Sequence, residues 1–322
     1  RNTVIVILVL IVIGLLLGLT LPRILYPATP TVFPQIGGGK ITHVIIIVEE
    51  NEGFASVIGN TSQAPYQNQL ASQYALATSY FAIGHPSLPN YIAMTSGSTL
   101  GFTSDCKPTA CNTTATNIVD LFRTHGITWK EYAESMPTPC NLTDANHYAP
   151  RHNPFVYYTD IVGNFTYCDQ HIVSMNVTTG AGFLEDLNNN SLPQFSFITP
   201  NTCDDGHDNT NICGGTSQVS NADKWLANLM PKIIASSEFN SSAVFIVYDE
   251  GGSSSNKVVN IVVSPFAKAG YSSSMQYTHY SLLATVENIF NLGNLGRNDS
   301  GAVPMSELFL ASSSLGSKSI TS

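Results

Sequence analysis

Charged side chains are scarce in this chain. They make up 11% of its 322 residues, and only 13 residues are lysine or arginine. An average soluble protein carries roughly 25% charged residues. The few basic residues form no patch, and the formal net charge is −9. Because a protein that binds nucleic acid needs a basic face to neutralise phosphates, this composition disfavours that function.

Several catalytic and metal-binding motifs are also missing. No two cysteines stand in a C-x-x-C pair, which disfavours a zinc ribbon. The chain has neither a P-loop nor the G-x-S-x-G elbow that many esterases use to present their serine. Hydrophobic residues nevertheless reach 43%, enough for a sizeable core in one large domain or two small ones.

Cysteines and glycosylation sequons indicate an oxidising, external environment. The cysteines can pair within short stretches, as Cys106 with Cys111, Cys140 with Cys168, and Cys203 with Cys213. Other connectivities remain open, because sequence alone does not determine pairing. Asn-x-Ser/Thr sequons occur at Asn60, Asn112, Asn141, Asn164, Asn176, Asn189, Asn240 and Asn298. This density suits a glycosylated protein outside the cell.

An uncharged apolar run covers residues 4–19. With the residues that follow, it approaches the roughly 20 residues needed to cross a bilayer. A cleavable signal peptide is the alternative, but its apolar region usually spans about 7 to 15 residues, and no A-x-A-type site follows Leu21. We therefore expect a transmembrane helix over 1–23 and a linker over 24–40. The remaining domain of this single-pass protein would lie on the extracellular side of the cell membrane.

The remaining chain alternates between apolar runs and helical patterns. A continuous β-branched run at 43–48 is typical of a strand buried on both faces of a sheet, and 243–248 and 258–263 are expected to form further buried strands. Helical patterns lie between the first two of these segments and after the third. We therefore predict an α/β fold over 41–310, with a mostly parallel central sheet and helices on both faces.

Two segments do not follow this alternation. Residues 134–180 show no regular pattern and hold two cysteines, so we expect an irregular, disulfide-bearing cap inserted over one end of the sheet. Residues 311–322 are rich in serine and are expected to form a flexible tail.

Polar clusters follow the predicted strands. They comprise Glu50-Asn51, the loop around Ser87, Asp205-Gly-His-Asp208 and Asp249-Glu250, while His279 precedes the last helix. Each cluster alone is more simply a helix cap or an Asx turn. Because the carboxyl ends of parallel strands share one edge of a sheet, we expect the clusters to converge there. Carboxylates, amides and histidines together are ligands of divalent metal ions.

The loop around Ser87 stands between an apolar run and a helical pattern that begins at about Asn90. A serine at a helix N-terminus lies near N–H groups that favour an anion, such as the phosphate of an ester. The alternative is a rigid turn flanked by two prolines. A serine nucleophile needs activation by a base or a metal, and two cations about 3.5 to 4 Å apart can assist phosphoryl displacement.

Taken together, these motifs resemble the phosphoesterase family of acid phosphatases and phospholipases C in the alkaline phosphatase superfamily. The resemblance covers about residues 41–296 and is closest to the acid phosphatases. Its motifs are Val48-Glu-Glu-Asn51, His85-Pro-Ser-Leu-Pro-Asn90, Arg151-His-Asn-Pro-Phe155, Asp205-Gly-His-Asp208, Val247-Tyr-Asp-Glu-Gly-Gly252 and Tyr277-Thr-His-Tyr280. No Cys-x-Pro-x-Arg motif occurs, which disfavours a sulfatase.

The resemblance implies an alkaline phosphatase-like fold and roles for these residues. Ser87 would be the nucleophile that forms a phosphoseryl intermediate, Asn90 would hold a phosphoryl oxygen, and His85 could protonate the leaving group. The implied ligands of one or two divalent ions (zinc, magnesium, calcium or iron) are Glu50, Asn51, Asp249 and Glu250, with Asp205, His207, Asp208 and His279 at a second metal or on the phosphate. His152 and Asn153 would bind substrate from the cap.

We therefore predict an extracellular, metal-dependent phosphomonoesterase whose partners are a phosphate-ester substrate and, through the N-terminal helix, the membrane. A phosphodiesterase of the phospholipase C type is the alternative enzyme. A cell-surface or membrane-complex subunit that keeps the fold without activity is the alternative outside the enzymes.

Overall fold

A central sheet of eight strands organises the part of the chain that the computed structural model describes, residues 33–175, 182–252 and 255–311. In spatial order the strands are β10 (Tyr271–Ser273), β2 (Ala75–Ala77), β9 (Asn260–Val263), β7 (Ser242–Tyr248), β1 (His43–Glu49), β6 (Phe195–Thr199), β4 (Trp129–Glu134) and β5 (Ile172–Met175). Among the described strands of this sheet, only β9 runs antiparallel to its neighbours. The predicted α/β class with a mostly parallel sheet is confirmed.

Strand β1 lies at the centre and runs parallel to β6 on one side and β7 on the other. Its Val44 pairs with Phe195 of β6 and with Ala243 of β7. The β-branched run of β1 is buried on both faces, as such runs are in parallel sheets. The register brings the carboxyl ends of β1 and β7 together, because Glu49 pairs with Tyr248.

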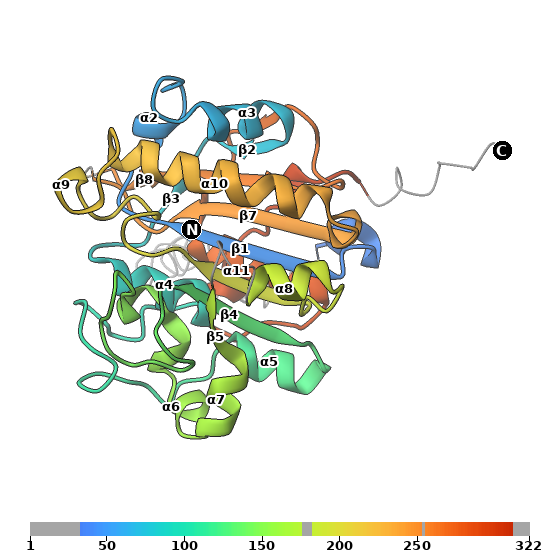
Figure 1. Cartoon of the computed structure of the whole chain (residues 1–322). Helices are drawn as coiled ribbons and strands as arrows, with labels where there is room; N and C mark the ends of the chain where they lie inside the picture. Colours follow the sequence, from blue (N-terminus) through green and yellow to red (C-terminus); the bar gives the residue numbers. More distant parts are fainter. Residues whose placement is uncertain (1–32, 176–181, 253–254, 312–322) are drawn as a thin grey trace, which may run out of the picture. The chain divides into compact units, whose positions relative to one another are not determined.

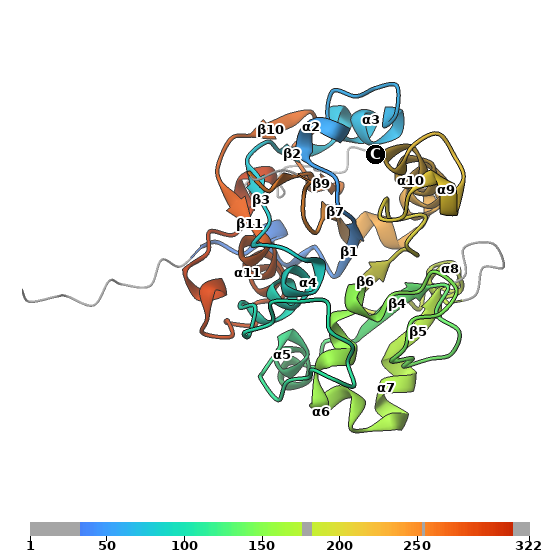
Figure 2. The same cartoon turned by 90° about the vertical axis from the view of Figure 1, so that its left-hand side faces the viewer.

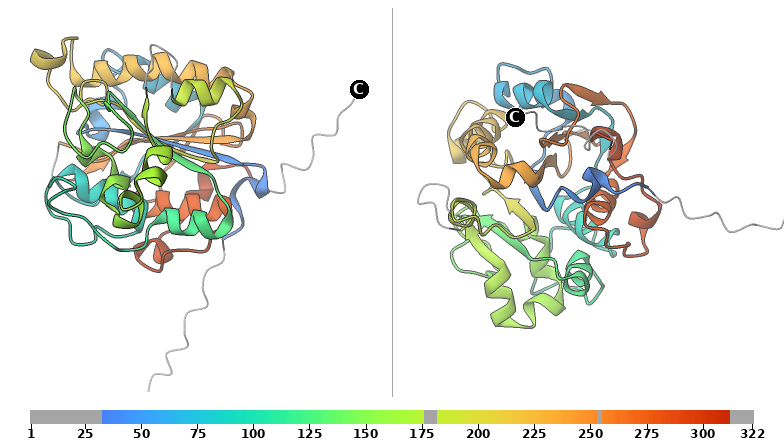
Figure 3. Two further views of the ribbon diagram at one scale, coloured as in Figure 1. Left: turned by 60° about the horizontal axis from the view of Figure 1, so that its bottom comes forward. Right: turned by 90° about the vertical axis from the view of Figure 1, so that its right-hand side faces the viewer.

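Helices cover both faces of the sheet (Figure 1). One layer holds α3 (Pro65–Gln73), α8 (Phe183–Asn188) and α10 (Gln218–Ala235). The opposite layer holds α4 (Ser87–Ser96), α5 (Ile118–His125) and α11 (His279–Phe290), as Figure 2 shows. The two views of Figure 3 show the same layers from other directions.

Short elements complete the described part of the chain. The shorter helices are α2 (Phe54–Val57), α6 (Thr159–Val162), α7 (Phe165–His171) and α9 (Thr210–Cys213). The 3-10 turns are η1 (Ile36–Gly39), η2 (Pro150–His152), η3 (Pro154–Tyr157), η4 (Glu238–Ser241), η5 (Asn298–Gly301) and η6 (Ser306–Leu308). A second, three-stranded sheet consists of β11 (Tyr277–Thr278), β3 (Tyr80–Phe81) and β8 (Lys257–Val258).

Helix α4 is buried along its whole length, from Ser87 to Ser96. It packs against α11 and η2, so every face of the helix meets protein. It ends at Gly97, which adopts a left-handed conformation with φ +74° and donates its N–H to Ala93. The side chain of Asp299 lies against Gly97, and a Cβ added at this glycine would stand 2.2 Å from Asp299 Oδ1.

All three disulfides form with the pairing named from the sequence: Cys106–Cys111, Cys140–Cys168 and Cys203–Cys213. The Cys203–Cys213 bond closes the loop that carries Asp205 and His207. The expectation of an irregular insertion over 134–180 missed regular structure. This segment contains η2, η3, α6 and α7, and it adds the edge strand β5 to the main sheet.

Within the described ranges, no helix is both long and apolar enough to cross a membrane. The predicted transmembrane helix over 1–23 lies outside these ranges, as do Asn176 and nearly all of the tail. The sequon asparagines that the structure does describe are exposed or half-buried. Membrane attachment and glycosylation therefore stay predictions.

We predict that Gly97→Ala destabilises the protein more than Gly126→Ala. Both glycines end a helix with positive φ, and an added Cβ meets no atom within 4 Å at Gly126. The left-handed conformation costs each alanine roughly 1 kcal/mol. The clash with Asp299 should cost Gly97→Ala about 1–3 kcal/mol more.

Denaturant unfolding of both variants and the wild type measures this difference in the free energy of unfolding. If both variants lose the same free energy of unfolding, the contact between Gly97 and Asp299 does not exclude a larger residue at position 97, and the prediction is wrong.

Candidate active site

The candidate site lies where β1, β6 and β7 end. Glu50 and Asn51 follow β1, Asp249 and Glu250 follow β7, and the loop with Asp205 follows β6. Because these strands run parallel, their carboxyl ends share one edge of the sheet. Helix α4 begins at Ser87 beside them. The predicted convergence of polar clusters is therefore observed.

Ser87 and Tyr91 both bind the carboxylate of Glu50. The hydroxyl of Ser87 donates to Glu50 Oε2 at 3.0 Å, and the hydroxyl of Tyr91 donates to Glu50 Oε1 at 2.6 Å. All three side chains are buried, with Ser87 at 3% exposure and the other two at 0%. The main-chain N–H of Leu88, in the first turn of α4, donates to Asp105 Oδ1 at 3.0 Å.

His152 lies between two carboxylates. Its Nε2 is 3.4 Å from Glu50 Oε1, and its Nδ1 is 3.2 Å from Asp205 Oδ2. Neither nitrogen has a hydrogen-bond partner of good geometry in the described part of the chain. The ring stacks on Tyr91, with centroids 5.5 Å apart and planes 5° from parallel. His152 is 1% exposed, so it belongs to the floor of the site.

The main chain binds one of the two carboxylate oxygens of Asp249. Its Oδ1 accepts from the N–H groups of Asn51 and Glu250, whereas its Oδ2 has no hydrogen-bond partner among the described residues. His279 Nε2 contacts the carbonyl oxygen of Asp249 at 2.6 Å, and its Nδ1 contacts the hydroxyl of Tyr80 at 3.0 Å. Both nitrogens of His279 therefore bind protein groups beside the site.

Glu250 connects His85 and Asn90. Its Oε2 is 3.0 Å from His85 Nδ1 and accepts from Asn90 Nδ2 at 3.2 Å. The amide of Asn90 also binds main-chain groups at Ile83, Gly84 and Pro86, so it fixes the loop that leads to Ser87. The side chain of His85 is 50% exposed, which places it at the entrance.

The loop after β6 supplies the other side of the site. Asp205 Oδ1 accepts from the N–H of His207 at 2.7 Å, while Asp205 Oδ2 has no hydrogen-bond partner in the described part. The His207 ring lies between Asp208 Oδ1, 2.9 Å from Nδ1, and Arg151 Nη2, 3.4 Å from Nε2. Asp208 also accepts from Thr202 at 2.7 Å and is half-buried.

Asn153, named as a substrate ligand, is fully buried at 0% exposure. Its Nδ2 donates to the hydroxyl of Tyr148 at 3.4 Å, and its Oδ1 has no hydrogen-bond partner among the described residues.

Burial and mutual repulsion raise the pKa values of the clustered carboxyls. Burial, with the charges of Asp249 and Asp205, raises the pKa of Glu50 well above its usual range. Burial and the charge of Glu250 raise the pKa of Asp249 to about 8, and burial raises the pKa of Asp205. In the described ranges, no lysine or arginine forms an ion pair with Glu50, Asp205 or Asp249.

These observations fit a divalent cation. Glu50, His152 and His207 can each offer a ligand atom, with the three atoms within 4.8 Å of one another. Asp205 Oδ2 and Asp249 Oδ2 are buried acceptors that lack a hydrogen-bond donor within the described chain. Buried charges are ordinarily paired or bound to metal. Carboxylate and imidazole ligands together suit hard or borderline divalent ions.

Comparison with known proteins identifies the family. A model of the phosphoesterase family matches residues 60–293. The chain belongs to this family. An acid phosphatase of Aspergillus fumigatus is 35% identical over 72% of this chain and 52% of its own length. A phosphatidylinositol-3-phosphatase of Mycobacterium tuberculosis is 30% identical over 82% of this chain and 83% of its own.

The fold of this phosphoesterase resembles solved structures of the alkaline phosphatase superfamily. A member from Vibrio parahaemolyticus superposes with a TM-score of 0.58 at 12% identity, over 87% of this chain and 74% of that one. The lipoteichoic acid synthase LtaP of Listeria monocytogenes gives 0.56 at 13% identity, over 83% and 77% of the two chains. The phosphoesterase spans 52–63% of the length of two fungal acid phosphatase relatives.

Three residues of the site were not assigned from the sequence. Tyr91 follows Ser87 by one helical turn, and this spacing was the available signal. Asp105 lies 17 positions beyond Leu88, the residue it binds, so no local pattern reveals their contact. Arg151 stands in a recognised motif, but its place beside His207 depends on the tertiary fold.

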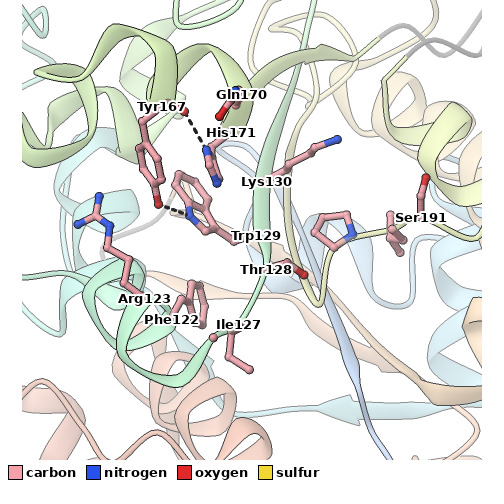
Figure 4. A pocket seen from close by; sticks show the side chains of 13 residues that line it. Phe122, Arg123, Ile127, Thr128, Trp129, Lys130, Tyr167, Gln170, His171 and Ser191 are labelled. Carbon is pink, nitrogen blue, oxygen red and sulfur yellow. Dashed lines mark hydrogen bonds between the residues drawn. The ribbon is translucent and has the colours of Figure 1, made fainter.

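A separate groove of about 530 Å³ lies beside Trp129, at the N-terminal end of β4 (Figure 4). The candidate site lies at the other, carboxyl-terminal edge of the sheet. Its cations are already paired. Arg123 contacts Asp120 and Asp160, and Lys130 contacts Asp186. The groove also lacks the unpaired buried carboxylates of the candidate site, so it offers no comparable chemistry.

We predict that divalent cations stabilise this phosphoesterase more at pH 8 than at pH 5. The pKa of Asp249 is about 8 in the folded protein and about 3.9 in an unfolded chain. The folded state therefore holds extra protons, and the metal-free protein should lose stability as pH rises from about 4 to 8. Cations that replace those protons should raise the melting temperature most where the carboxyls would otherwise be charged.

Thermal unfolding at the two pH values, with and without magnesium, manganese or zinc, measures the effect. Asp249→Asn should flatten both the pH dependence and the cation response. A wild-type response that is absent, or equal at both pH values, would contradict a cation site built from these carboxyls.

Proposed function

We propose that this phosphoesterase is a phosphoric monoester hydrolase of the acid phosphatase type, with Ser87 as its nucleophile. The observation that carries this proposal is the hydrogen bond from Ser87 to Glu50 at the N-terminus of α4. It lies beside two buried carboxylates, Asp205 and Asp249, each with one oxygen that has no hydrogen-bond partner among the described residues. A helix N-terminus favours the phosphoryl anion that Ser87 would attack. The acid phosphatase relatives support the same reaction class.

One or two divalent cations belong to the proposal. Glu50, Asn51 and Asp249 would hold a cation beside Ser87, and Asp205, His152 and His207 would hold or neutralise charge on the opposite side. Such a cation supplies charge neutralisation and lowers the pKa of a hydroxyl that it binds. The hydroxyls of Ser87 and Tyr91 would orient the carboxylate of Glu50 toward it.

In the proposed reaction, Ser87 Oγ forms a bond to phosphorus as the ester oxygen departs. Glu50 Oε2 is placed to accept the hydroxyl proton, because it is already the acceptor of that hydrogen bond. His85 stands at the entrance beside Glu250 and is placed to protonate the departing oxygen. Water then attacks the phosphoseryl group, which releases phosphate and restores the serine.

The names of two relatives favour a monoester over a diester as the substrate. The acid phosphatase and phosphatidylinositol-3-phosphatase relatives are both named as phosphatases, and the second matches over most of its length. A phospholipase C-type diesterase and a non-catalytic surface subunit are the competing outcomes of the experiment below. We also propose that residues 1–23 anchor the protein in the membrane and that the domain lies outside the cell.

Ser87→Ala should lower kcat for a monoester such as p-nitrophenyl phosphate by at least about 10³-fold. Ser96→Ala is the matched control, since its hydroxyl stands on the same helix and donates to the main-chain carbonyls of Ile92 and Ser98, away from the carboxylates of the site. The assay uses the purified chain stripped of metal and then supplied with each cation. Bis-p-nitrophenyl phosphate provides the diester comparison.

Full activity in Ser87→Ala would refute the nucleophile assignment. A preference for the diester would favour the phospholipase C-type reaction. A folded wild type without activity under any metal would favour the non-catalytic subunit.

A further inference from the structure

Two hydroxyl groups of helix α4 donate hydrogen bonds to the same carboxylate. Ser87 and Tyr91 are four residues apart, so their side chains lie on the same face of the helix. Ser87 donates to Glu50 Oε2, and Tyr91 donates to Glu50 Oε1 by the shorter contact, 2.6 Å. A single helical turn therefore holds both oxygens of Glu50.

The position of the Tyr91 ring is fixed by its neighbours. It is fully buried, it stacks in parallel on His152, and it packs against Phe197 with centroids 6.3 Å apart. Because an immobile ring presents its hydroxyl at one point in space, the contact with Glu50 Oε1 has a defined geometry.

The carboxylate of Glu50 needs this support. The terminal torsion of a glutamate is broad, so an unsupported carboxylate turns easily. Without the Tyr91 hydroxyl, Oε1 would keep only His152 Nε2 at 3.4 Å, a contact without good hydrogen-bond geometry. Rotation of the carboxylate would carry Oε2 away from Ser87.

We propose that Tyr91 is a positioning residue: its hydroxyl holds Oε1 of Glu50, so that Oε2 faces Ser87 and the carboxylate is presented to a divalent cation. Tyr91 acts through Glu50 and touches neither the phosphate nor the cation. The proposal rests on the proposed function of Ser87 and Glu50. It adds that α4 supplies the nucleophile together with the group that orients its partner.

A purely structural role for Tyr91 makes a different forecast. Tyr91→Phe keeps the ring, the stack on His152 and the packing, and it removes a single hydrogen bond. If Tyr91 serves only the core, this variant should therefore affect kcat and cation affinity no more than loss of a hydroxyl elsewhere on the helix does. Tyr158 offers a matched control. It is fully buried, and its hydroxyl contacts Thr95 of the same helix at 2.7 Å without touching a carboxylate.

The test compares Tyr91→Phe with Tyr158→Phe in the full chain. Steady-state kinetics with p-nitrophenyl phosphate give kcat and KM, and calorimetric titration of the metal-stripped proteins gives the affinity for manganese or zinc. We expect Tyr91→Phe to lower kcat about 10- to 100-fold, with KM changed less than about 3-fold, and to weaken cation affinity about 10-fold or more, as loss of an outer partner of a ligand does. Tyr158→Phe should change each quantity less than about 3-fold.

Any other pattern overturns the proposal, including unchanged cation affinity in Tyr91→Phe or equal effects in the two variants. Failure of the proposed function is distinguishable. If Ser87→Ala keeps its activity, the nucleophile assignment fails, while the cation affinities of the two phenylalanine variants still decide whether Tyr91 orients Glu50.

Discussion

Repulsion among buried carboxylates is the constraint on which the rest of this structure depends. Glu50, Asp205 and Asp249 point into one site from three parallel strands, and none has a lysine or arginine partner among the described residues. Such a cluster is unfavourable for folding by itself. The register of β1 with β6 and β7 places these groups regardless, because long buried β-branched runs hold the strands in position.

The buried helix α4 complements this charge. Its N-terminal turn brings a hydroxyl to Glu50, and its next turn brings a second hydroxyl and an aromatic face for His152. The carboxylate of Glu50 is therefore bordered by two neutral donors that fix its direction. A cation can then replace the protons that the raised pKa values keep on the carboxyls of the site, and it meets ligands that are already oriented.

Sequence reasoning was most successful where local pattern determines structure. The apolar runs at 43–48 and 243–248 correspond to the central strands β1 and β7, and the polar residues after them share one edge because parallel strands end together. Pairing of nearby cysteines, such as Cys203 with Cys213, was also predicted correctly.

Contacts that depend on distant segments were not predicted. The edge strand β5 has only four residues and gains its identity by pairing with β4. His279 and His152 both stand in motifs named from the sequence, but their surroundings differ. Protein groups bind both ring nitrogens of His279, whereas those of His152 have no hydrogen-bond partner among the described residues. The partners of a side chain in the core follow from tertiary packing, which a motif does not encode.

The junction between Gly97 and the segment near Asp299 has a consequence for biosynthesis. Asn298 donates its N–H to Gly97, and Arg297 donates to the carbonyl of Ser96, so the end of α4 is fastened by residues about 200 positions further along the chain. A ribosome makes Ser87 about 200 residues before it makes these residues. The helix that bears Ser87 therefore reaches this anchorage only after every strand of the central sheet has been synthesised, and a nascent chain that ends before Arg297 lacks it.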